Sequence, residues 1–333
     1  MTRYSVLDLC PVVEGGTPAD AFRHSRDLAR HVERLGYERF WLAEHHGMPG
    51  VASAATSIVI SHVAAGTSRI RVGAGGIMLP NHSPLVIAEQ FGTLASLYPG
   101  RIELGLGRAP GTDQMTARAL RRTLDSDPNE FPRDVMELVG YFRDPEPNQY
   151  VRAIPGEGTH VPVWILGSSL FGASLAAALG LPFAFASHFA PAQMMQAIEI
   201  YRGRFKPSEF LQQSYLMLGY NVFAAPTDDE ARFLASSMQQ AFIAIRTGRA
   251  IRLQPPIENF EATLGPAERH LLEQTLERSA IGSPETVRST LGDFVVRTGA
   301  DEVMIASQIF DHDLRKRSYT IAAEAVGLPA PDD

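Results

Sequence analysis

Cysteine is nearly absent from this sequence of 333 residues, in which Cys10 is the only one. A single cysteine cannot form an internal disulfide, which excludes the disulfide-stabilised secreted domains and is typical of a reducing compartment. The amino-terminal residues also lack the apolar stretch and cleavage site of a signal peptide. We therefore expect a cytoplasmic protein in which Cys10 is small buried filler, since no catalytic partner for its thiol can be identified.

Excess positive charge and long apolar runs are missing as well. The chain carries 30 basic and 37 acidic residues, a formal net charge of −7, so it has no electrostatic signature of nucleic-acid binding. No apolar run reaches the ~20 residues that would span a bilayer. A hydrophobic content of 45% excludes disorder, because a chain this apolar can bury a large core. The composition predicts a globular protein that binds neither nucleic acid nor membrane.

Short runs rich in β-branched residues alternate with longer amphipathic segments along the chain. Eight of these runs are predicted as strands buried on both faces, because most are continuously apolar. They are Tyr4–Leu9, Arg39–Ala43, Ile70–Ala74, Ile102–Leu106, Val161–Leu166, Phe183–Ala186, Leu216–Ala224 and Glu302–Ala306. Eight strand-then-helix units predict an α/β fold, a (β/α)8 TIM barrel, with an open doubly wound sheet as the alternative.

The segments between these strands carry helix start signals. Thr17 and Pro18 are the expected N-cap and first residue of the first helix, because proline fits a position whose N–H has no partner in the helix. Comparable starts are expected at Pro84, Pro132, Pro191 and Pro284.

Three segments are longer than a minimal barrel needs: residues 111–131, 149–160 and 247–266. Insertions that follow barrel strands lie on the carboxyl-terminal face, where the active sites of barrels are built. The chain shows no repeat, low-complexity tract or interdomain linker. We therefore expect residues 1–333 to form a single domain, with insertions near 111–131 and 247–266, the second of them a loop or lid.

The densest group of chemically active residues is Glu44, His45 and His46, at the end of the second predicted strand. Catalytic groups of barrels lie at such strand ends, and an imidazole can donate or accept a proton near neutral pH. The same residue types bind zinc or iron, so a metal-dependent hydrolase or isomerase is an alternative. Consecutive strand residues point to opposite faces, however, so His45 and His46 cannot both reach one ion without a bend. A strand-end histidine held by a backbone hydrogen bond is the purely structural alternative.

The glycine pair Gly75–Gly76 follows the third predicted strand. Because glycine has no Cβ, the pair would let a flat group lie against the main chain, although a tight turn explains it as well. His82 and Ser83 precede Pro84 and are candidates for capping the next helix.

Three further strand ends carry polar residues. Arg108 follows the fourth strand and suits bidentate phosphate binding, with a solvated side chain as the alternative. Ser168 and Ser169 precede a helix whose free backbone N–H groups form an anion site, and N-capping by Ser169 is compatible with it. His188 follows the sixth strand and either lines the pocket or merely precedes a helix. Together these positions outline, on one rim, a site for a planar cofactor that carries a phosphate.

Two motifs, Phe40–His46 and Val72–Pro80, occur at a spacing that is specific for one protein family. Further matching segments are Tyr98–Ile102, Gly105–Arg108, Ala178–Pro182, Ile281–Glu285 and Gly299–Glu302. Through these residues the sequence resembles the bacterial luciferase-like flavin monooxygenase family over most of its length.

The resemblance implies a barrel that binds reduced FMN at its carboxyl-terminal face and uses O2 to oxidise a small organic substrate, such as an aldehyde. A separate reductase would supply the reduced flavin. His45 matches the catalytic histidine of the family and Glu44 the residue before it. Gly75–Gly76 match the place of an unusual cis peptide beside the flavin ring. Arg108 matches a phosphate-binding arginine, and Ser168–Ser169 match the hydroxyls of the second phosphate site.

The sequence departs from luciferases at Gly107, which stands where they carry a reactive cysteine. Neither the luciferase geometry for an aldehyde nor light emission therefore follows from the resemblance. Arg118 matches a further family arginine only across a gap. A deazaflavin in place of FMN and a non-catalytic flavin-binding protein stay open as alternatives. The helix expected over residues 53–65 is apolar on all sides, which together with the resemblance predicts a homodimer.

Overall fold

Nine parallel strands form one sheet in the computed structural model, which describes residues 2–109, 111–112, 114–120 and 130–329. The strands are β1 (Arg3–Asp8), β2 (Arg39–Leu42), β3 (Arg71–Met78), β4 (Ile102–Gly107), β5 (Val163–Gly167), β6 (Phe183–Phe185), β7 (Leu216–Ala224), β8 (Ser279–Gly282) and β9 (Glu302–Ala306). Neighbouring strands pair in the order β6-β5-β4-β3-β2-β1-β9-β7, and a further pairing of β6 with β7 closes the ring. The predicted eight-stranded barrel is confirmed, and the open sheet is wrong.

The ninth strand, β8, lies outside the ring and was not predicted. Its residues pair with Asn221–Ala224, at the carboxyl end of β7, beyond the point where β6 stops. Only Ala280 and Gly282 of its four residues are buried. A segment this short, with two small inward residues, carries no apolar pattern that would distinguish it from a loop.

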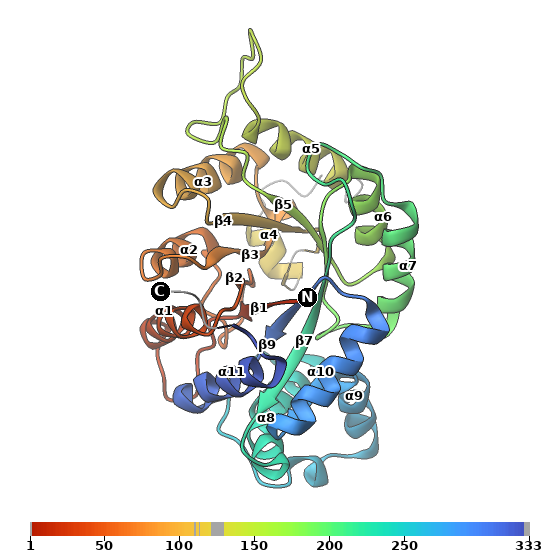
Figure 1. Ribbon diagram of the computed structural model, residues 1–333. Coiled ribbons are helices and arrows are strands. Elements are labelled where there is room, and N and C mark those ends of the chain that lie inside the picture. The colour runs from red at the N-terminus through yellow and green to blue at the C-terminus, as the bar shows by residue number, and fades with distance from the viewer. Residues whose placement is uncertain (1, 110, 113, 121–129, 330–333) are drawn as a thin grey trace.

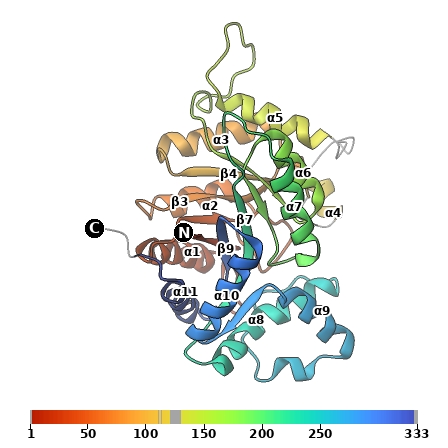
Figure 2. The same ribbon diagram turned by 45° about the vertical axis from the view of Figure 1, so that its right-hand side comes forward.

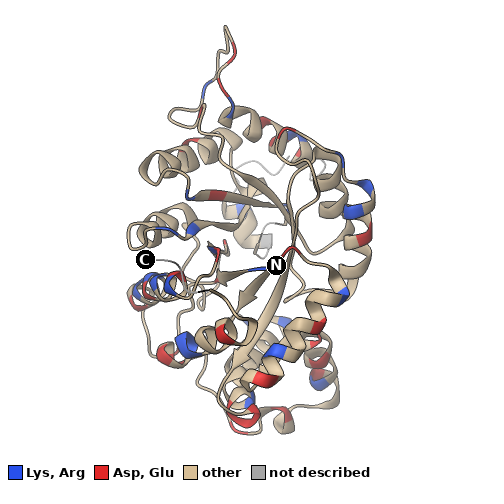
Figure 3. Cartoon of the chain, in the orientation of Figure 1, with Lys and Arg blue, Asp and Glu red and all other residues tan. Residues whose placement is uncertain are grey.

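The strands are surrounded by helices (Figure 1). Among the described residues these are α1 (Pro18–Arg34), α2 (Thr56–Ala64), α3 (Pro84–Leu97), α4 (Gln114–Leu120), α5 (Phe131–Phe142), α6 (Leu170–Leu179), α7 (Met194–Arg204), α8 (Asp228–Arg246), α9 (Pro266–Leu276), α10 (Pro284–Thr298) and α11 (His312–Val326). Basic and acidic side chains are interspersed along them (Figure 3). No described helix is long and apolar enough to cross a membrane.

The expected helix starts are mostly confirmed. The Thr17 side chain accepts a hydrogen bond from the backbone N–H of Asp20, and Pro18 is the first residue of α1. Pro84 and Pro284 likewise begin α3 and α10. Two starts differ slightly: Pro132 is the second residue of α5, and Pro191 begins the short 3-10 helix η3 (Pro191–Gln193) that precedes α7. The helix expected over residues 53–65 is α2, which is shorter at both ends.

The core lies in two layers that follow from the alternation of strand side chains. Val6 and Phe40 point outward and join the large apolar cluster between strands and helices. Leu7 and Trp41, their neighbours in sequence, point into the barrel and pack with Trp164, Met217, Met304 and other inward residues. The barrel interior is therefore filled by side chains and is not a pore.

The insertion at 247–266 runs across the carboxyl end of the barrel. Leu253 is buried, and its backbone exchanges hydrogen bonds with Val12 and Glu14 in the loop after β1, at 3.0 and 2.8 Å. The insertion contains the 3-10 helix η4 (Phe260–Thr263) and lies with α8 and α9 in a lobe beside the barrel (Figure 2). The insertion near 111–131 contains α4, and parts of it lie outside the described residues.

Candidate active site

The carboxylate of Glu44 is the centre of the polar group that follows β2. Glu44 is 1% exposed, and its Oε1 accepts hydrogen bonds from His46 Nε2 at 2.7 Å and His82 Nε2 at 2.8 Å. Its Oε2 accepts from the backbone N–H of Met78, at the end of β3, at 3.1 Å. Burial by itself would raise the pKa of this carboxyl, but the hydrogen bonds from His82, His46 and Met78 outweigh it and lower the pKa. Glu44 is therefore a buried carboxylate near neutral pH.

His82 is the member of this group whose contact the sequence did not indicate. The sequence predicts a capping role for His82 at the start of α3, yet its side chain lies against Glu44, which is 38 residues earlier. Ser83 is the N-cap residue of α3 but makes no side-chain capping bond. No local pattern could have paired Glu44 with His82, because only the parallel alignment of β2 and β3 brings their loops together.

The metal alternative needs a different ligand set from the one expected. Single ligand atoms of Glu44, His46 and His82 lie within 4.8 Å of one another and could hold an ion. His45 is not part of this cluster, because its Nδ1 lies against the carbonyl oxygen of Gly111 instead. The cluster that could hold an ion therefore contains His82 in place of His45.

His45 is held by the main chain of the neighbouring insertion. Its Nδ1 lies 3.3 Å from the carbonyl oxygen of Gly111. Burial is the largest influence on His45 and lowers the pKa of its imidazole. A neutral ring whose Nδ1–H donates to Gly111 leaves Nε2 as an acceptor. His45 is thus both held by a backbone hydrogen bond and chemically available.

His188 lines the site. Its ring is buried, and burial, followed by the charge on His45, lowers the pKa of His188 to about 4. Its Nδ1 has no hydrogen-bond partner among the described residues. The ring packs so tightly on β7 that a Cβ at Gly219 would lie 2.1 Å from Nδ1. His188, Trp41 and Gly75 border one small cavity at the carboxyl end of the barrel. A buried ring nitrogen without a partner is a place where a polar group of a ligand can bind.

The glycine pair forms a close-packed shelf on β3. The Gly75–Gly76 peptide bond is cis, and the pairing with β4 is irregular at this point. A Cβ at Gly76 would lie 2.6 Å from the carbonyl oxygen of Gly105, and one at Gly75 would lie 2.9 Å from the side chain of Leu7. The main chain of β4 leaves no room for a side chain at Gly76, and a side chain at Gly75 would have to displace Leu7 and press on Trp41.

The predicted phosphate-binding residues lie next to one another. Arg108 is exposed at the end of β4, and its guanidinium carbon lies 4.1 Å from the centre of the Phe171 ring, in the first turn of α6. Ser169 is the N-cap residue of α6 and makes no side-chain capping bond, and Ser168 is exposed beside it. The free N–H groups of a helix start and a neighbouring guanidinium form an anion site. Arg118 lies exposed on α4.

Comparison with known proteins assigns a family. A family model described as luciferase-like monooxygenase matches residues 2–302. A protein of Escherichia coli named luciferase-like monooxygenase is 54% identical to this chain over 96% of both. The N-acetyl-S-alkylcysteine monooxygenase of Bacillus subtilis is 34% identical over 76% of this chain and 77% of its own. The crystal structure of apo-MsnO8 is 35% identical and superposes with a TM-score of 0.88, covering 99% of this chain and 100% of that one.

More distant structures share the fold. The oxygenating constituent of 3,6-diketocamphane monooxygenase from Pseudomonas putida, in complex with FMN, has a TM-score of 0.73 at 16% identity, over 99% of both chains. An F420-dependent secondary alcohol dehydrogenase has a TM-score of 0.68 at 14% identity, over 98% of this chain and 99% of its own.

Proposed function

The chain belongs to the luciferase-like monooxygenase family, and from that premise we propose that it is an FMN-dependent monooxygenase that oxidises a small organic substrate with O2. The proposal rests on one observation. The Gly75–Gly76 shelf, the anion site at Arg108 and the neutral imidazole of His45 all lie on the same rim of the barrel. These are the features that a flat ring, its phosphate and a proton transfer require.

The residues present fit a flavin. The Gly75–Gly76 peptide carries no side chain, and Gly75 borders the cavity that Trp41 and His188 also line, where a flavin ring would lie. Arg108 and the N–H groups at the start of α6 would bind the phosphate, with Ser168 and Ser169 offering their hydroxyls. Reduced flavin, when bound, supplies the electrons that let O2 deliver one oxygen atom to the substrate.

His45 would accept and return protons next to the Gly75–Gly76 shelf. His45 donates from Nδ1 to Gly111 and so keeps Nε2 directed to the reacting groups, where it can accept a proton and return it. Glu44 does not face the reaction directly. It holds the N–H groups of His46 and His82 and thereby stabilises the loops after β2 and β3. We assign His45 a catalytic role and Glu44 a positioning role.

Further parts of the proposal concern surroundings and partners. The 247–266 segment, fastened at Leu253 to the loop after β1, would exclude water from the site. A separate flavin reductase would supply the reduced cofactor. We also propose a homodimer, because the apolar residues Ile58 on α2 and Leu97 on α3 are 70% and 60% exposed. A cytoplasmic location remains part of the proposal.

Reduced-flavin turnover under ¹⁸O2 tests the function. Aldehydes, ketones, amines and thioethers are offered with chemically reduced FMN, and product mass is read for one added ¹⁸O atom. Thioethers are included because a relative carries the name N-acetyl-S-alkylcysteine monooxygenase. A parallel series with reduced deazaflavin F420 tests the alternative cofactor, which a protein of the same fold uses. Oxygen uptake that no substrate increases would indicate a non-catalytic flavin-binding protein.

A metal-dependent hydrolase or isomerase is the second candidate, favoured only by the Glu44–His46–His82 cluster. The two imidazoles already share one carboxylate oxygen of Glu44, so the cluster is complete without an ion. Elemental analysis of the purified protein, beside its flavin absorption spectrum, separates the two candidates. Stoichiometric metal with no flavin binding would overturn the monooxygenase proposal.

A further inference from the structure

A second cavity, of about 460 Å³, lies at the amino end of the barrel. Its lining includes Arg3, Arg39 and Arg71, each at the beginning of a strand, and Trp164 of β5. The candidate active site lies where these strands end, so the two are separated by the filled interior of the barrel. The volume is within the range of small-molecule sites. Nothing in the proposed monooxygenase function uses this cavity.

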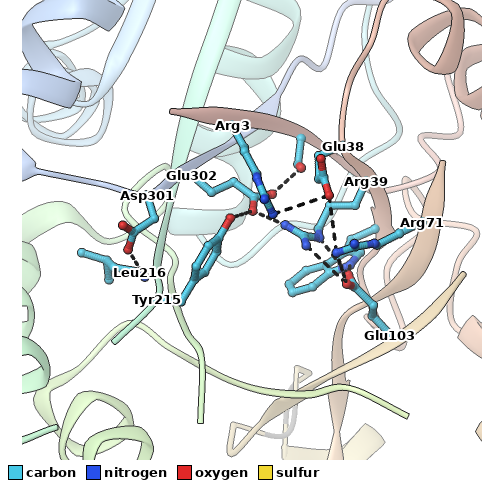
Figure 4. A network of polar contacts seen from close by, with 11 residues as sticks. Arg3, Glu38, Arg39, Arg71, Glu103, Tyr215, Leu216, Asp301 and Glu302 are labelled. Carbon is cyan, nitrogen blue, oxygen red and sulfur yellow. Dashed lines mark hydrogen bonds and ion pairs between the residues drawn. The ribbon is translucent and has the colours of Figure 1, made fainter. Parts of the chain in front are cut away.

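The arginines of the cavity fall into two groups (Figure 4). Arg39 is buried and fully occupied, since its guanidinium binds Glu103 at 2.8 Å and also pairs with Glu302. Arg3 and Arg71 are half-exposed. Arg3 pairs with Glu38 at 3.7 Å, and Arg71 pairs with both Glu38 and Glu103 at 3.4 Å. These ion pairs engage one terminal nitrogen of each arginine, so within the described part of the chain other N–H donors of the two guanidinium groups remain for a ligand.

Arg143, which follows α5, adds an unpaired donor to the lining of the cavity. Its terminal nitrogen pairs with Glu209, but its Nε is buried and has no hydrogen-bond partner among the described residues. A buried N–H without an acceptor costs free energy, so an acceptor brought by a ligand would be favoured there. The planar guanidinium suits the two oxygens of a carboxylate.

The rest of the wall is apolar and its charge is nearly balanced. Val139, Phe142, Trp164 and Phe210 supply the apolar surface. Glu103 and Glu209 also line the cavity, and Glu38 and Glu302 pair with its arginines. Four carboxylates therefore offset the four arginines, so a multiply charged anion would meet repulsion where a single charge would not. We propose that this cavity binds an organic monocarboxylate, with the carboxylate on Arg143 and Arg71 and an apolar body against Phe142 and Trp164.

Calorimetric titration of the whole protein tests the site with two probes. The first is 3-phenylpropionate and the second its uncharged amide, 3-phenylpropanamide. We expect the acid to bind and the amide to bind about tenfold more weakly or not at all, because the amide forms no charge-assisted hydrogen bond. Equal affinity for both probes, or no binding of the acid at millimolar concentration, would overturn the proposal.

Variants locate the binding. Arg143→Gln and Arg71→Gln should each weaken binding of the acid by about tenfold, whereas Arg232→Gln, an exposed arginine on α8, should leave it unchanged. Two separate arginines keep the test decisive if one variant fails to fold. Addition of FMN should not change the affinity, because the sites lie at opposite ends of the barrel. Unchanged binding in both variants, or competition with FMN, would show that the acid binds elsewhere.

Discussion

The two ends of the barrel hold buried charge in different ways. At the amino end Arg39 lies between Glu103 and Glu302. The indole N–H of Trp41 donates a further hydrogen bond to Glu103, and the hydroxyl of Tyr215 donates one to Glu302. At the carboxyl end the buried Nδ1 of His188 has no hydrogen-bond partner among the described residues, and His45 is held through its Nδ1 by the carbonyl oxygen of Gly111. Paired charge fills the interior of the barrel at its amino end, beneath the cavity that Arg71 and Arg143 line, whereas the unpartnered nitrogen of His188 faces the candidate site at the carboxyl end. The difference is typical of barrels, whose amino face serves stability and whose carboxyl face serves catalysis.

The largest expected effect is the loss of stability when the ion pairs of Arg39 at the amino end are broken. Arg39→Met removes the cation from two buried carboxylates and should lower the free energy of unfolding by about 3–5 kcal/mol. Arg3→Met, on the same face but half-exposed, should cost no more than about 1 kcal/mol. Denaturant unfolding of both variants measures the contrast. Equal small losses would mean that the Arg39 network contributes little to stability.

Low pH should lower the free energy of unfolding through protonation of His188, at the carboxyl end of the barrel. Its pKa is lowered to about 4, so the folded protein prefers the neutral ring and the unfolded chain binds the proton first. The stability contributed by the neutral ring is present above the unfolded pKa of about 6.5 and is lost as pH falls toward 4, by about 2–3 kcal/mol.

Unfolding free energies measured between pH 7 and 4 check the role of His188. The loss should be smaller in His188→Gln, whereas His270→Gln, exposed on α9, should follow the wild type. The same pH slope in His188→Gln and in the wild type would assign the acid sensitivity to other groups.

Catalysis should separate from cofactor binding at His45. His45→Ala removes the proton acceptor but none of the phosphate contacts, so FMN should bind almost normally while product yield falls on the order of 100-fold. Hydrogen peroxide should be released in place of product. Titration of FMN and product analysis measure the two effects. Near wild-type yield would make His45 a structural strand-end residue.

The phosphate anchor should give a somewhat smaller effect. Arg108→Ala should weaken FMN binding by roughly 1.5–3 kcal/mol, as the loss of a hydrogen bond to a charged group does. Arg232→Ala, exposed on α8, is the matched control and should leave the dissociation constant unchanged. A constant unchanged by Arg108→Ala would remove that residue from the site.

The smallest expected effect is a change of oligomeric state, caused by a substitution on the exposed face of α2. Ile58→Glu, on α2, should shift the protein toward monomer in light scattering at micromolar concentration, because a charge would be buried in the proposed dimer contact. Val296→Glu, on α10, where Val296 is 85% exposed against 70% for Ile58, should leave the oligomeric state unchanged. A monomeric wild type would overturn the dimer.

The sequence alone determined the barrel and most of its rim. Its apolar runs predict eight strands, because buried parallel strands need continuous apolar segments, and its Thr17–Pro18 pair predicts the start of α1. Gly75–Gly76 was recognised because only glycine tolerates such close main-chain contact. These are local requirements, and a local requirement leaves a local pattern.

Tertiary structure decided which polar side chains meet. The bond from His82 to Glu44, the burial of His188 against Gly219 and the pairing of Leu253 with the loop after β1 each join segments that lie far apart in the sequence. The strand β8 likewise forms only because the end of β7 extends beyond β6. Such contacts arise when the ring of strands closes and aligns their ends, and no residue type or spacing within one segment can encode that alignment.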